Sequence, residues 1–175
     1  MIEASRLRAS SPAGDSSADA AGRALTGGTV VVDAVVVDAS VAFGWFAAVP
    51  GSEQAVQLLE ASPPLRLIAP DLVLIELLNA GWRSLRAGAI TAEQLEGIAE
   101  LAPGLFSEFV PAASLLAAAH RWCIQLDHPA YDCLYLALAE REGATLITQD
   151  QRLLQKLKPT PAARGLALPL QAWRP

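Results

Sequence analysis

The sequence predicts an α/β fold with three layers, in which helices cover both faces of a central, mostly parallel sheet. Short runs rich in Val, Ile and Leu alternate along the chain with longer segments whose apolar residues recur at helical spacing. The first run lies in the stretch 29–46, TVVVDAVVVDASVAFGWF, and reads as a strand buried on both faces. Strands that alternate with helices in this way indicate a parallel sheet between two helical layers.

Turn residues and caps set the predicted boundaries of the elements. The first strand ends at Asp38, and Ser40 is a suitable cap for a helix at 41–47. The further strands are predicted at 65–69, 105–110 (a short strand or an extended link), 144–148 and, as an edge strand, 166–170. The further helices are predicted at 52–61, 71–87, 91–101, 112–126, 129–142 and 151–157. Proline or glycine follows several of these helices, and Pro103 with Gly104 is expected to end the one at 91–101.

One domain is predicted at residues 30–175, preceded by a disordered tail at residues 1–29. The chain has 175 residues, of which 53% are hydrophobic, and this suffices for a single well-buried core. The tail is rich in Ser, Ala, Gly and Asp and has no apolar period with which to pack. It is either a natural extension or the result of a start site placed too far upstream.

Composition narrows the classes of partner and compartment. The net charge of −5 argues against a tight non-specific nucleic-acid binder, because such affinity comes from Lys and Arg on phosphates, but it allows an enzyme that holds nucleic acid through metal ions. The two cysteines, Cys123 and Cys133, show neither a disulfide framework nor a zinc spacing, which suits the reducing cytoplasm. No apolar run approaches the roughly 18 residues that a membrane span needs, so no membrane association is expected.

Four acidic residues stand in unusually apolar surroundings. Asp38 and Asp150 each follow a predicted strand, at the edge of the sheet where α/β proteins place their active sites. Glu76 lies inside LVLIELL and Asp132 inside YDCLYLALA, with no cation beside either. An ionised carboxylate in such surroundings is costly unless a partner compensates its charge. Several carboxylates without nearby cations indicate a divalent metal, and hard oxygen ligands favour Mg²⁺ or Mn²⁺.

Each of these acids also has a structural interpretation. Glu76 could be solvated on a helix face, and Asp132 could be favoured in a first turn by the helix dipole. Asp150 could cap the helix that follows it, and Asp38 could be a turn residue. Asp33 competes with Asp38 because VVVDA occurs twice in tandem, but more valine follows Asp33, so it is interpreted as an exposed residue at the strand entry. The four acids together are stronger evidence for a site than any one of them.

The acids are carried by four separated segments, VVVDASVAFGWF, APDLVLIELLNAGW, HPAYDCLYLALAE and ATLITQDQRLL. These segments span nearly all of residues 35–157 and resemble those of PIN-domain nucleases, most closely the VapC-type toxins of bacterial toxin–antitoxin pairs. The resemblance implies a PIN-like fold in which four catalytic acids gather at the carboxyl end of the sheet and bind Mg²⁺ or Mn²⁺. In this chain those acids are Asp38, Glu76, Asp132 and Asp150. The matching supporting residues are Ser40, Asn79 and Thr148.

The resemblance also implies a function. It predicts a metal-dependent endoribonuclease of the cytoplasm that acts as a toxin, with the metal activating a water for attack on the scissile phosphorus. The implied substrate is structured cellular RNA, often tRNA. The implied partners are a small cognate antitoxin that inserts into the acidic site and a second copy of the chain in a homodimer.

Three other functions remain as alternatives. A PIN nuclease of RNA maturation or DNA repair, without a toxin role, would carry the same motifs, and a neighbouring antitoxin gene would distinguish the two. A catalytically inactive PIN-like binding module is disfavoured by the presence of all four acids. A phosphatase of the haloacid-dehalogenase type also places Asp after a valine strand, but it needs a second acid two residues later, where this chain has Ser40.

The remaining polar and aromatic residues are assigned structural roles. His120 is interpreted as a helix-face residue, His128 as helix entry, and Asp127 as a cap of the next helix. Arg83 and Arg86 could meet RNA phosphate or an antitoxin, although a solvated helix face is favoured. The aromatic residues assigned to the core or a dimer surface, rather than to base stacking, are Trp45, Trp82, Trp122 and Tyr135.

Overall fold

Residues 34–174 are described by the structure, which is a computed structural model. The predicted tail at residues 1–29 and the predicted strand-entry residue Asp33 lie outside the described residues. Both therefore stay predictions, as does the start of the domain near residue 30.

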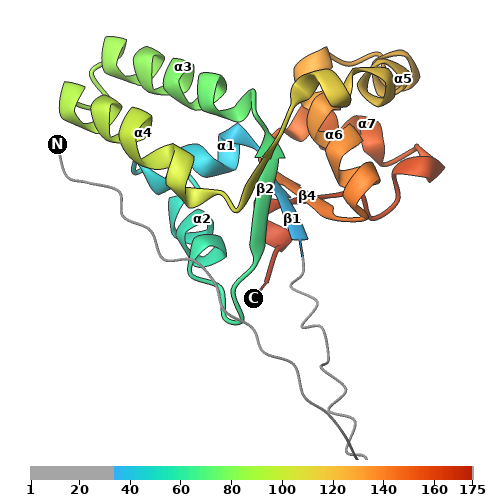
Figure 1. Cartoon of the computed structure of the whole chain (residues 1–175), viewed down its shortest axis with the longest axis horizontal. Coiled ribbons are helices and arrows are strands. Elements are labelled where there is room, and N and C mark those ends of the chain that lie inside the picture. The colour runs from blue at the N-terminus through green and yellow to red at the C-terminus, as the bar shows by residue number, and fades with distance from the viewer. Residues whose placement is uncertain (1–33, 175) are drawn as a thin grey trace, which may run out of the picture. The chain divides into compact units, whose positions relative to one another are not determined.

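A sheet of five parallel strands, in the order β3-β2-β1-β4-β5, runs through the centre of residues 34–174 (Figure 1). The strands are β1 (Ala34–Val37), β2 (Arg66–Pro70), β3 (Glu108–Val110), β4 (Thr145–Thr148) and β5 (Ala167–Pro169). Every neighbouring pair is parallel, and Val36 of β1 lies opposite Ile68 on one side and Leu146 on the other. All three side chains are fully buried, so the valine run forms the central strand as predicted.

Helices cover both faces of the sheet, which confirms the predicted three-layer α/β/α fold. In Figure 1, α1 to α4 gather on one side of the strands and α5 to α7 on the other. The helices are α1 (Ala39–Ala42), α2 (Ser52–Leu59), α3 (Val73–Arg86), α4 (Ala92–Leu105), α5 (Leu116–Leu126), α6 (Ala130–Glu142) and α7 (Gln151–Leu157). Among the helices of the described chain, none combines the length and the apolar character that a bilayer span requires.

The helix α6 is buried on all sides because it lies between the sheet and α5. It packs across β1, β2 and β4, and α5 packs against it in turn. Its residues from Cys133 to Ala139 are all buried, which explains why this helix carries no polar stripe. Because α6 leads into the start of β4, its own first turn, with Asp132, lies at the opposite, carboxyl edge of the sheet.

The helices α3 and α4 approach each other closely at Gly81. A Cβ atom at this position would lie 2.7 Å from Leu95 and 2.8 Å from Ile98 of α4, so a larger residue would displace both side chains. The helix α4 also runs to Leu105, past its predicted end at residue 101. Pro103 stands in the last turn, where it removes one backbone hydrogen bond, and the burial of the α4 face against the core maintains the helix beyond it.

The segment after β1 begins its helix earlier than predicted, because Asp38 and not Ser40 is the N-cap. The Asp38 side chain accepts the backbone N–H of Ser40 at 3.3 Å, so α1 starts directly after the acid. The chain then tightens into a 3₁₀ turn, Phe43–Trp45, in place of the predicted helix to residue 47. The predicted helix at 112–126 likewise opens as a 3₁₀ turn, Ala112–Ser114, before α5.

The strand order changes direction between β1 and β4. From β1 the chain builds outward through β2 to β3, and it then returns to add β4 and β5 on the other side. The loops that leave the carboxyl ends of β1 and β4 therefore diverge, and α/β proteins bind ligands in the crevice that this leaves. Asp38 directly follows β1 and Asp150 comes shortly after β4, so both acids lie at this point.

Candidate functional site

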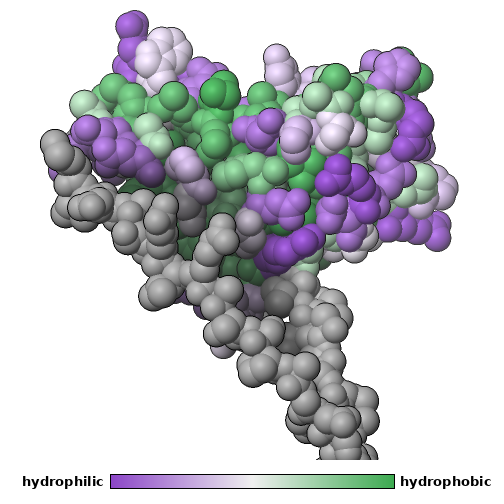
Figure 2. All heavy atoms as spheres, viewed as in Figure 1, coloured by the Kyte–Doolittle hydropathy of each residue, from purple (hydrophilic) through white to green (hydrophobic). Residues whose placement is uncertain are grey.

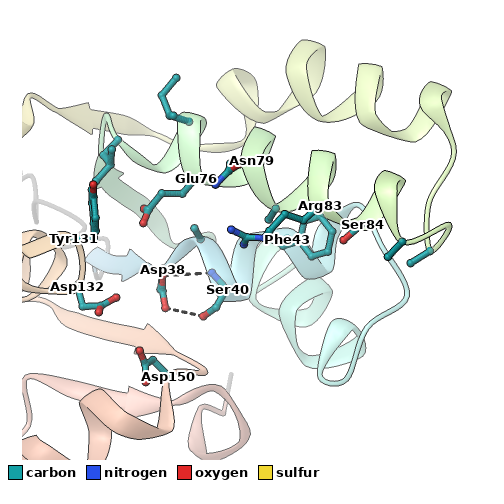
Figure 3. Close-up of a pocket in the computed structure, with 16 residues that line it drawn as sticks. Asp38, Ser40, Phe43, Glu76, Asn79, Arg83, Ser84, Tyr131, Asp132 and Asp150 are labelled. Atoms are coloured by element: carbon teal, nitrogen blue, oxygen red, sulfur yellow. Dashed lines mark hydrogen bonds between the residues drawn. The ribbon is translucent and has the colours of Figure 1, made fainter. Parts of the chain in front are cut away.

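A pocket of about 860 Å³ opens at the carboxyl edge of the sheet. All four predicted acids line it: Asp38, Glu76, Asp132 and Asp150. They come from the ends of β1 and β4 and from the first turns of α3 and α6. In Figure 3 their carboxylates turn toward one shared space. The structure therefore brings together residues that lie far apart in the sequence, while their catalytic role stays a prediction.

Asp38 is the most buried of the four acids, with 9% of its surface exposed. Its Oδ2 accepts hydrogen bonds from the hydroxyls of Ser40 at 2.6 Å and Thr148 at 2.5 Å, and its Oδ1 accepts the Ser40 N–H. Burial raises the pKa of the Asp38 carboxyl, the hydrogen bonds oppose that rise, and the charge of Asp150 adds to it. The hydroxyls of Ser40 and Thr148 thus fix Asp38 in one orientation and stabilise its ionised form.

Thr148 connects the first acid with the fourth. Its buried hydroxyl donates to Asp38 and accepts the backbone N–H of Asp150 at 3.0 Å. The Oδ1 atom of Asp150 accepts the N–H groups of Arg152 at 2.7 Å and Leu153 at 3.1 Å, which caps α7. Within residues 34–174 no hydrogen bond engages the other oxygen, Oδ2, so Asp150 can cap the helix and still offer a ligand atom to the pocket.

Glu76 is oriented by Tyr135, whose hydroxyl donates to Oε2 at 2.5 Å. Tyr135 comes from α6 and is fully buried, whereas Glu76 on α3 is partly open to the pocket. Burial raises the pKa of the Glu76 carboxyl, the Tyr135 hydrogen bond lowers it, and the charges of Asp38 and Asp132 raise it further. Burial and the neighbouring carboxylates also hold the pKa of Tyr135 well above its usual value, so its hydroxyl remains a donor.

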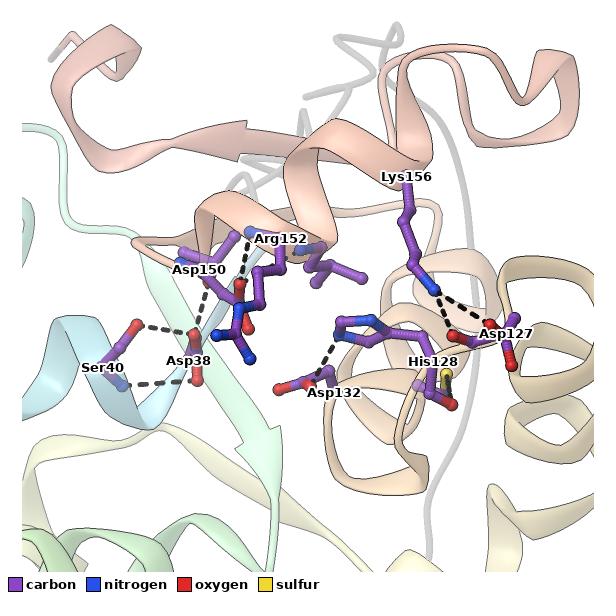
Figure 4. Close-up of polar contacts among 11 residues, drawn as sticks. Asp38, Ser40, Asp127, His128, Asp132, Asp150, Arg152 and Lys156 are labelled. Carbon is purple, nitrogen blue, oxygen red and sulfur yellow. Dashed lines mark hydrogen bonds and ion pairs between the residues drawn. The ribbon is translucent and has the colours of Figure 1, made fainter.

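Asp132 lies beside His128, which precedes it by four residues in the chain (Figure 4). The Nε2 atom of His128 is 2.8 Å from Asp132 Oδ2, and only 6% of the His128 side chain is exposed. Burial raises the pKa of the Asp132 carboxyl, the charges of Asp38 and Asp150 also raise it, and His128 lowers it. His128 therefore belongs to the site, although the sequence analysis assigned it to helix entry alone.

The turn before His128 is set by Asp127. Asp127 adopts the left-handed conformation with a φ of 47° and ends α5. It therefore caps the preceding helix, and the prediction that it caps the next helix is wrong. Asp is among the few residues that adopt this conformation readily. Lys156 of α7 donates to the Asp127 carbonyl oxygen and lies 3.5 Å from its carboxylate, which ties the turn to α7. This turn directs His128 toward Asp132.

Apart from the contact of His128 with Asp132, the charge of the four acids is not balanced by basic side chains in the described part of the chain. Within residues 34–174, no Lys or Arg forms an ion pair with any of them. Three of the four have a raised pKa, caused by burial first and by mutual repulsion as well. A divalent cation would offset this repulsion, and carboxylate oxygens are the ligands that Mg²⁺ and Mn²⁺ prefer. The residues present therefore fit such an ion.

The three predicted supporting residues reach the pocket in different ways. Thr148 and Ser40 hydrogen-bond to Asp38, and Ser40 also binds the loop after β4, because its Oγ accepts the Gln149 N–H at 3.2 Å. Asn79 lines the pocket on α3, as does Arg83. In Figure 3 the Arg83 guanidinium extends back along the pocket toward the acids. Arg83 is exposed, as its interpretation as part of a solvated helix face predicts, and it also lines the pocket.

Tyr135 and His128 are the two site residues that the sequence analysis missed. Tyr135 was assigned to the core or a dimer surface, and its ring does lie in the core. A signal was present, because a buried tyrosine hydroxyl needs a hydrogen-bond partner and its helix is otherwise apolar. His128 stands four residues before Asp132, the spacing of one helical turn, although it lies just before the start of α6.

The tryptophans take structural positions, in line with their assignment. The indole N–H of Trp45 donates to the Ala55 carbonyl at 2.8 Å, and its ring packs against Phe106. Trp122 is buried, and its N–H donates to Glu140 at 3.1 Å. Trp82 on α3 is 53% exposed and remains the one of the three available to a partner.

Known proteins share the sequence pattern and the fold of this chain. Residues 35–158 match the family model described as PIN domain. The chain is 30% identical over 124 residues to Ribonuclease VapC3 from Pyrobaculum aerophilum, an alignment that covers 70% of this chain and 93% of that protein. Its fold is similar to the crystal structure of PAE2754 from Pyrobaculum aerophilum, with a TM-score of 0.52 and 23% identity over 80% of this chain and 92% of the other.

Proposed function

Because the chain belongs to the PIN-domain family, we propose that it is a metal-dependent endoribonuclease that acts in the cytoplasm as the toxin of a toxin–antitoxin pair. The match to a protein named as a VapC ribonuclease supports the choice of RNA as substrate. The observation that carries the proposal is the pocket of four acids from four elements, none of which pairs with Lys or Arg in the described part of the chain.

The proposal assigns Mg²⁺ or Mn²⁺ to the four acids Asp38, Glu76, Asp132 and Asp150. When bound, such an ion lowers the pKa of a water and neutralises charge at a phosphate. Around it, the chain's own residues supply orientation: Ser40 and Thr148 fix Asp38, and Tyr135 fixes Glu76. Arg83 and Asn79, on the wall formed by α3, are placed to contact the phosphate backbone of RNA.

Cleavage by the purified full-length chain tests the enzyme assignment. Wild-type protein is expected to cut tRNA or other structured RNA in Mg²⁺ or Mn²⁺ and to stop in EDTA. Asp38→Asn should lower the rate at least about 100-fold, because one charge is lost at the site. Asp71→Asn is the matched control, since Asp71 accepts the Ala112 N–H at 3.0 Å through an oxygen that Asn also has. Wild-type cleavage by folded Asp38→Asn would refute the site, and cleavage of DNA flaps alone would favour a repair nuclease.

A surface beside the pocket supports the proposed antitoxin. Ile75, Leu78 and Trp82 share one face of α3 by their spacing and are all exposed. Hydrophobic residues gather over this helix in Figure 2. We expect the antitoxin to lay an apolar segment on this face and to place an Arg among the acids, because carboxylates form strong charge-assisted hydrogen bonds with Arg.

The growth of cells tests the toxin role. Expression of the chain alone should arrest growth, and co-expression of the small gene beside it should restore growth. Glu76→Gln should be harmless, whereas Glu100→Gln on the exposed face of α4 should remain toxic. Harmless wild-type protein at good expression, together with RNA cleavage in vitro, would instead indicate a nuclease of RNA maturation; absence of both would indicate a binding module.

A second exposed apolar pair, Leu116 and Ile124 on α5, supports the proposed homodimer. This pair is separate from the face of α3, so one subunit can meet a second copy and an antitoxin at the same time. Sedimentation equilibrium should give twice the chain mass for the wild type, and Ile124→Lys should lower it toward the monomer. An unchanged dimer in Ile124→Lys, with Ile75→Lys dissociated, would place the dimer on α3 instead.

A further inference from the structure

His128 is a buried histidine whose Nε2 contacts a carboxylate but makes no directed hydrogen bond. Its side chain is 94% buried, as 6% is exposed, and its Nε2 makes no hydrogen bond. The nearest acidic atom, Asp132 Oδ2, is 2.8 Å away, yet the ring nitrogen is not directed at it as a hydrogen-bond donor would be. The contact with Asp132 is therefore an ion pair without a directed hydrogen bond, and native structures rarely leave a buried nitrogen without one.

The surroundings of that nitrogen are those of a metal ligand. One atom each from His128, Asp132 and Asp150 lie within 4.8 Å of one another. Two ligands of one transition-metal ion at bond lengths of about 2.1 Å are themselves roughly 2.9–3.4 Å apart, which is close to the 2.8 Å between His128 Nε2 and Asp132 Oδ2. The free Oδ2 of Asp150 and the two Asp132 oxygens complete a set of nitrogen and oxygen donors.

We propose that His128, Asp132 and Asp150 form a mixed nitrogen–oxygen site for a transition-metal ion of the Zn²⁺ or Mn²⁺ class. Imidazole binds such ions well and binds Mg²⁺ and Ca²⁺ poorly, so the histidine separates this site from one made of carboxylates alone. The inference rests on the proposed function only in that two of the acids are shared. It adds a ligand from outside the four acids and a selectivity that the acids do not provide.

The geometry around His128 supports a positioned ligand. The left-handed turn at Asp127 sets its backbone, and Lys156 of α7 holds that turn through the Asp127 carbonyl oxygen (Figure 4). The same helix, α7, is capped by Asp150, so one helix fixes both the third ligand, Asp150, and the turn that presents the first, His128. The site is therefore held by α6 and α7 together.

Direct metal binding by the untagged full-length protein, without RNA, tests the inference. In pulsed electron paramagnetic resonance, bound Mn²⁺ should show the nitrogen coupling of an imidazole ligand. The chain has two histidines, and His120 is exposed on α5, so His120→Ala is the matched control that should keep the coupling. His128→Gln should lose it. By calorimetry, His128→Gln should weaken Zn²⁺ binding by about 10–100-fold and change Mg²⁺ binding less than threefold.

The outcomes separate this inference from the proposed function. An absence of nitrogen coupling in the wild type, or equal Zn²⁺ affinity in wild type and folded His128→Gln, overturns the mixed site even if Asp38→Asn abolishes RNA cleavage. Nitrogen coupling and Zn²⁺ selectivity in a chain that cuts no RNA would support the mixed site and reject the nuclease. If His128→Gln fails to fold, the persistence or loss of coupling in His120→Ala decides, because only two histidines are present.

Discussion

Tyr135→Phe removes one hydroxyl from the base of the pocket and leaves the buried ring in place. The lost interaction is the hydrogen bond to Glu76 Oε2 at 2.5 Å. Hydrogen bonds to charged groups contribute about 1.5–3 kcal/mol, and Glu76 is partly open to water that can replace the hydroxyl, so the lower figure of about 1.5 kcal/mol applies. For a chain of 175 residues this lowers Tm by about 3–6 °C.

Thermal melts in EDTA at several pH values measure this effect. The Tyr135 hydroxyl lowers the pKa of Glu76, so it stabilises the folded state while Glu76 is ionised. The deficit of Tyr135→Phe should therefore be full at neutral pH and shrink as the pH falls and Glu76 takes up a proton. Tyr131→Phe is the matched control, because Tyr131 is 61% exposed. Equal melting of Tyr135→Phe and wild type at neutral pH would refute the orientation of Glu76 by Tyr135.

Three further predictions follow from the same site. Without metal, the free energy of unfolding should fall as the pH rises through the pKa values of Asp38, Glu76 and Asp132, because burial and repulsion raise these values and the folded state then binds more protons than the unfolded state. Added Mg²⁺ should reduce this dependence on pH. A dependence that metal leaves unchanged would count against the site. Thr148→Val should cost about 1–3 kcal/mol in urea unfolding, because it removes one of the hydrogen bonds to Asp38 and leaves the Asp150 N–H without a partner, whereas Thr145→Val on the same strand should cost less; equal losses would contradict the bridging role. A chain that starts at Thr29 should keep its Tm and its cleavage rate, and a loss of several degrees would show that the preceding residues pack on the domain.

The strand-end acids were predictable because their context is local. Asp38 and Asp150 follow buried runs in the sequence, and a parallel sheet brings the carboxyl ends of such strands to one edge. Glu76 and Asp132 stood out because apolar residues surround them on both sides. These are signals that one strand or one helix carries by itself, and the fold class follows from the same alternation of elements.

The roles of Tyr135 and His128 depend on contacts that no single element contains. The Tyr135 hydroxyl meets Glu76 across 59 positions of sequence, only because α6 and α3 both begin at the pocket. His128 faces Asp132 because Asp127 adopts a left-handed backbone that Lys156 holds from another helix. The end of α4 was misplaced for a related reason, since the propensity of Pro103 to stop a helix is weaker than the burial of that helix face.

The hydrogen bond from Thr148 to Asp38 spans 110 positions of the chain and has a consequence for synthesis. A polypeptide that ends before β4 lacks Thr148 and Asp150 and leaves one side of β1 without its neighbour. Such a chain carries the first three acids but cannot assemble them with the fourth. During translation the proposed nuclease would therefore stay inert until nearly all of it had left the ribosome, and products of premature termination would be harmless to the RNAs around them. If the chain does cleave RNA, the topology of its sheet would delay that cleavage until synthesis is nearly complete.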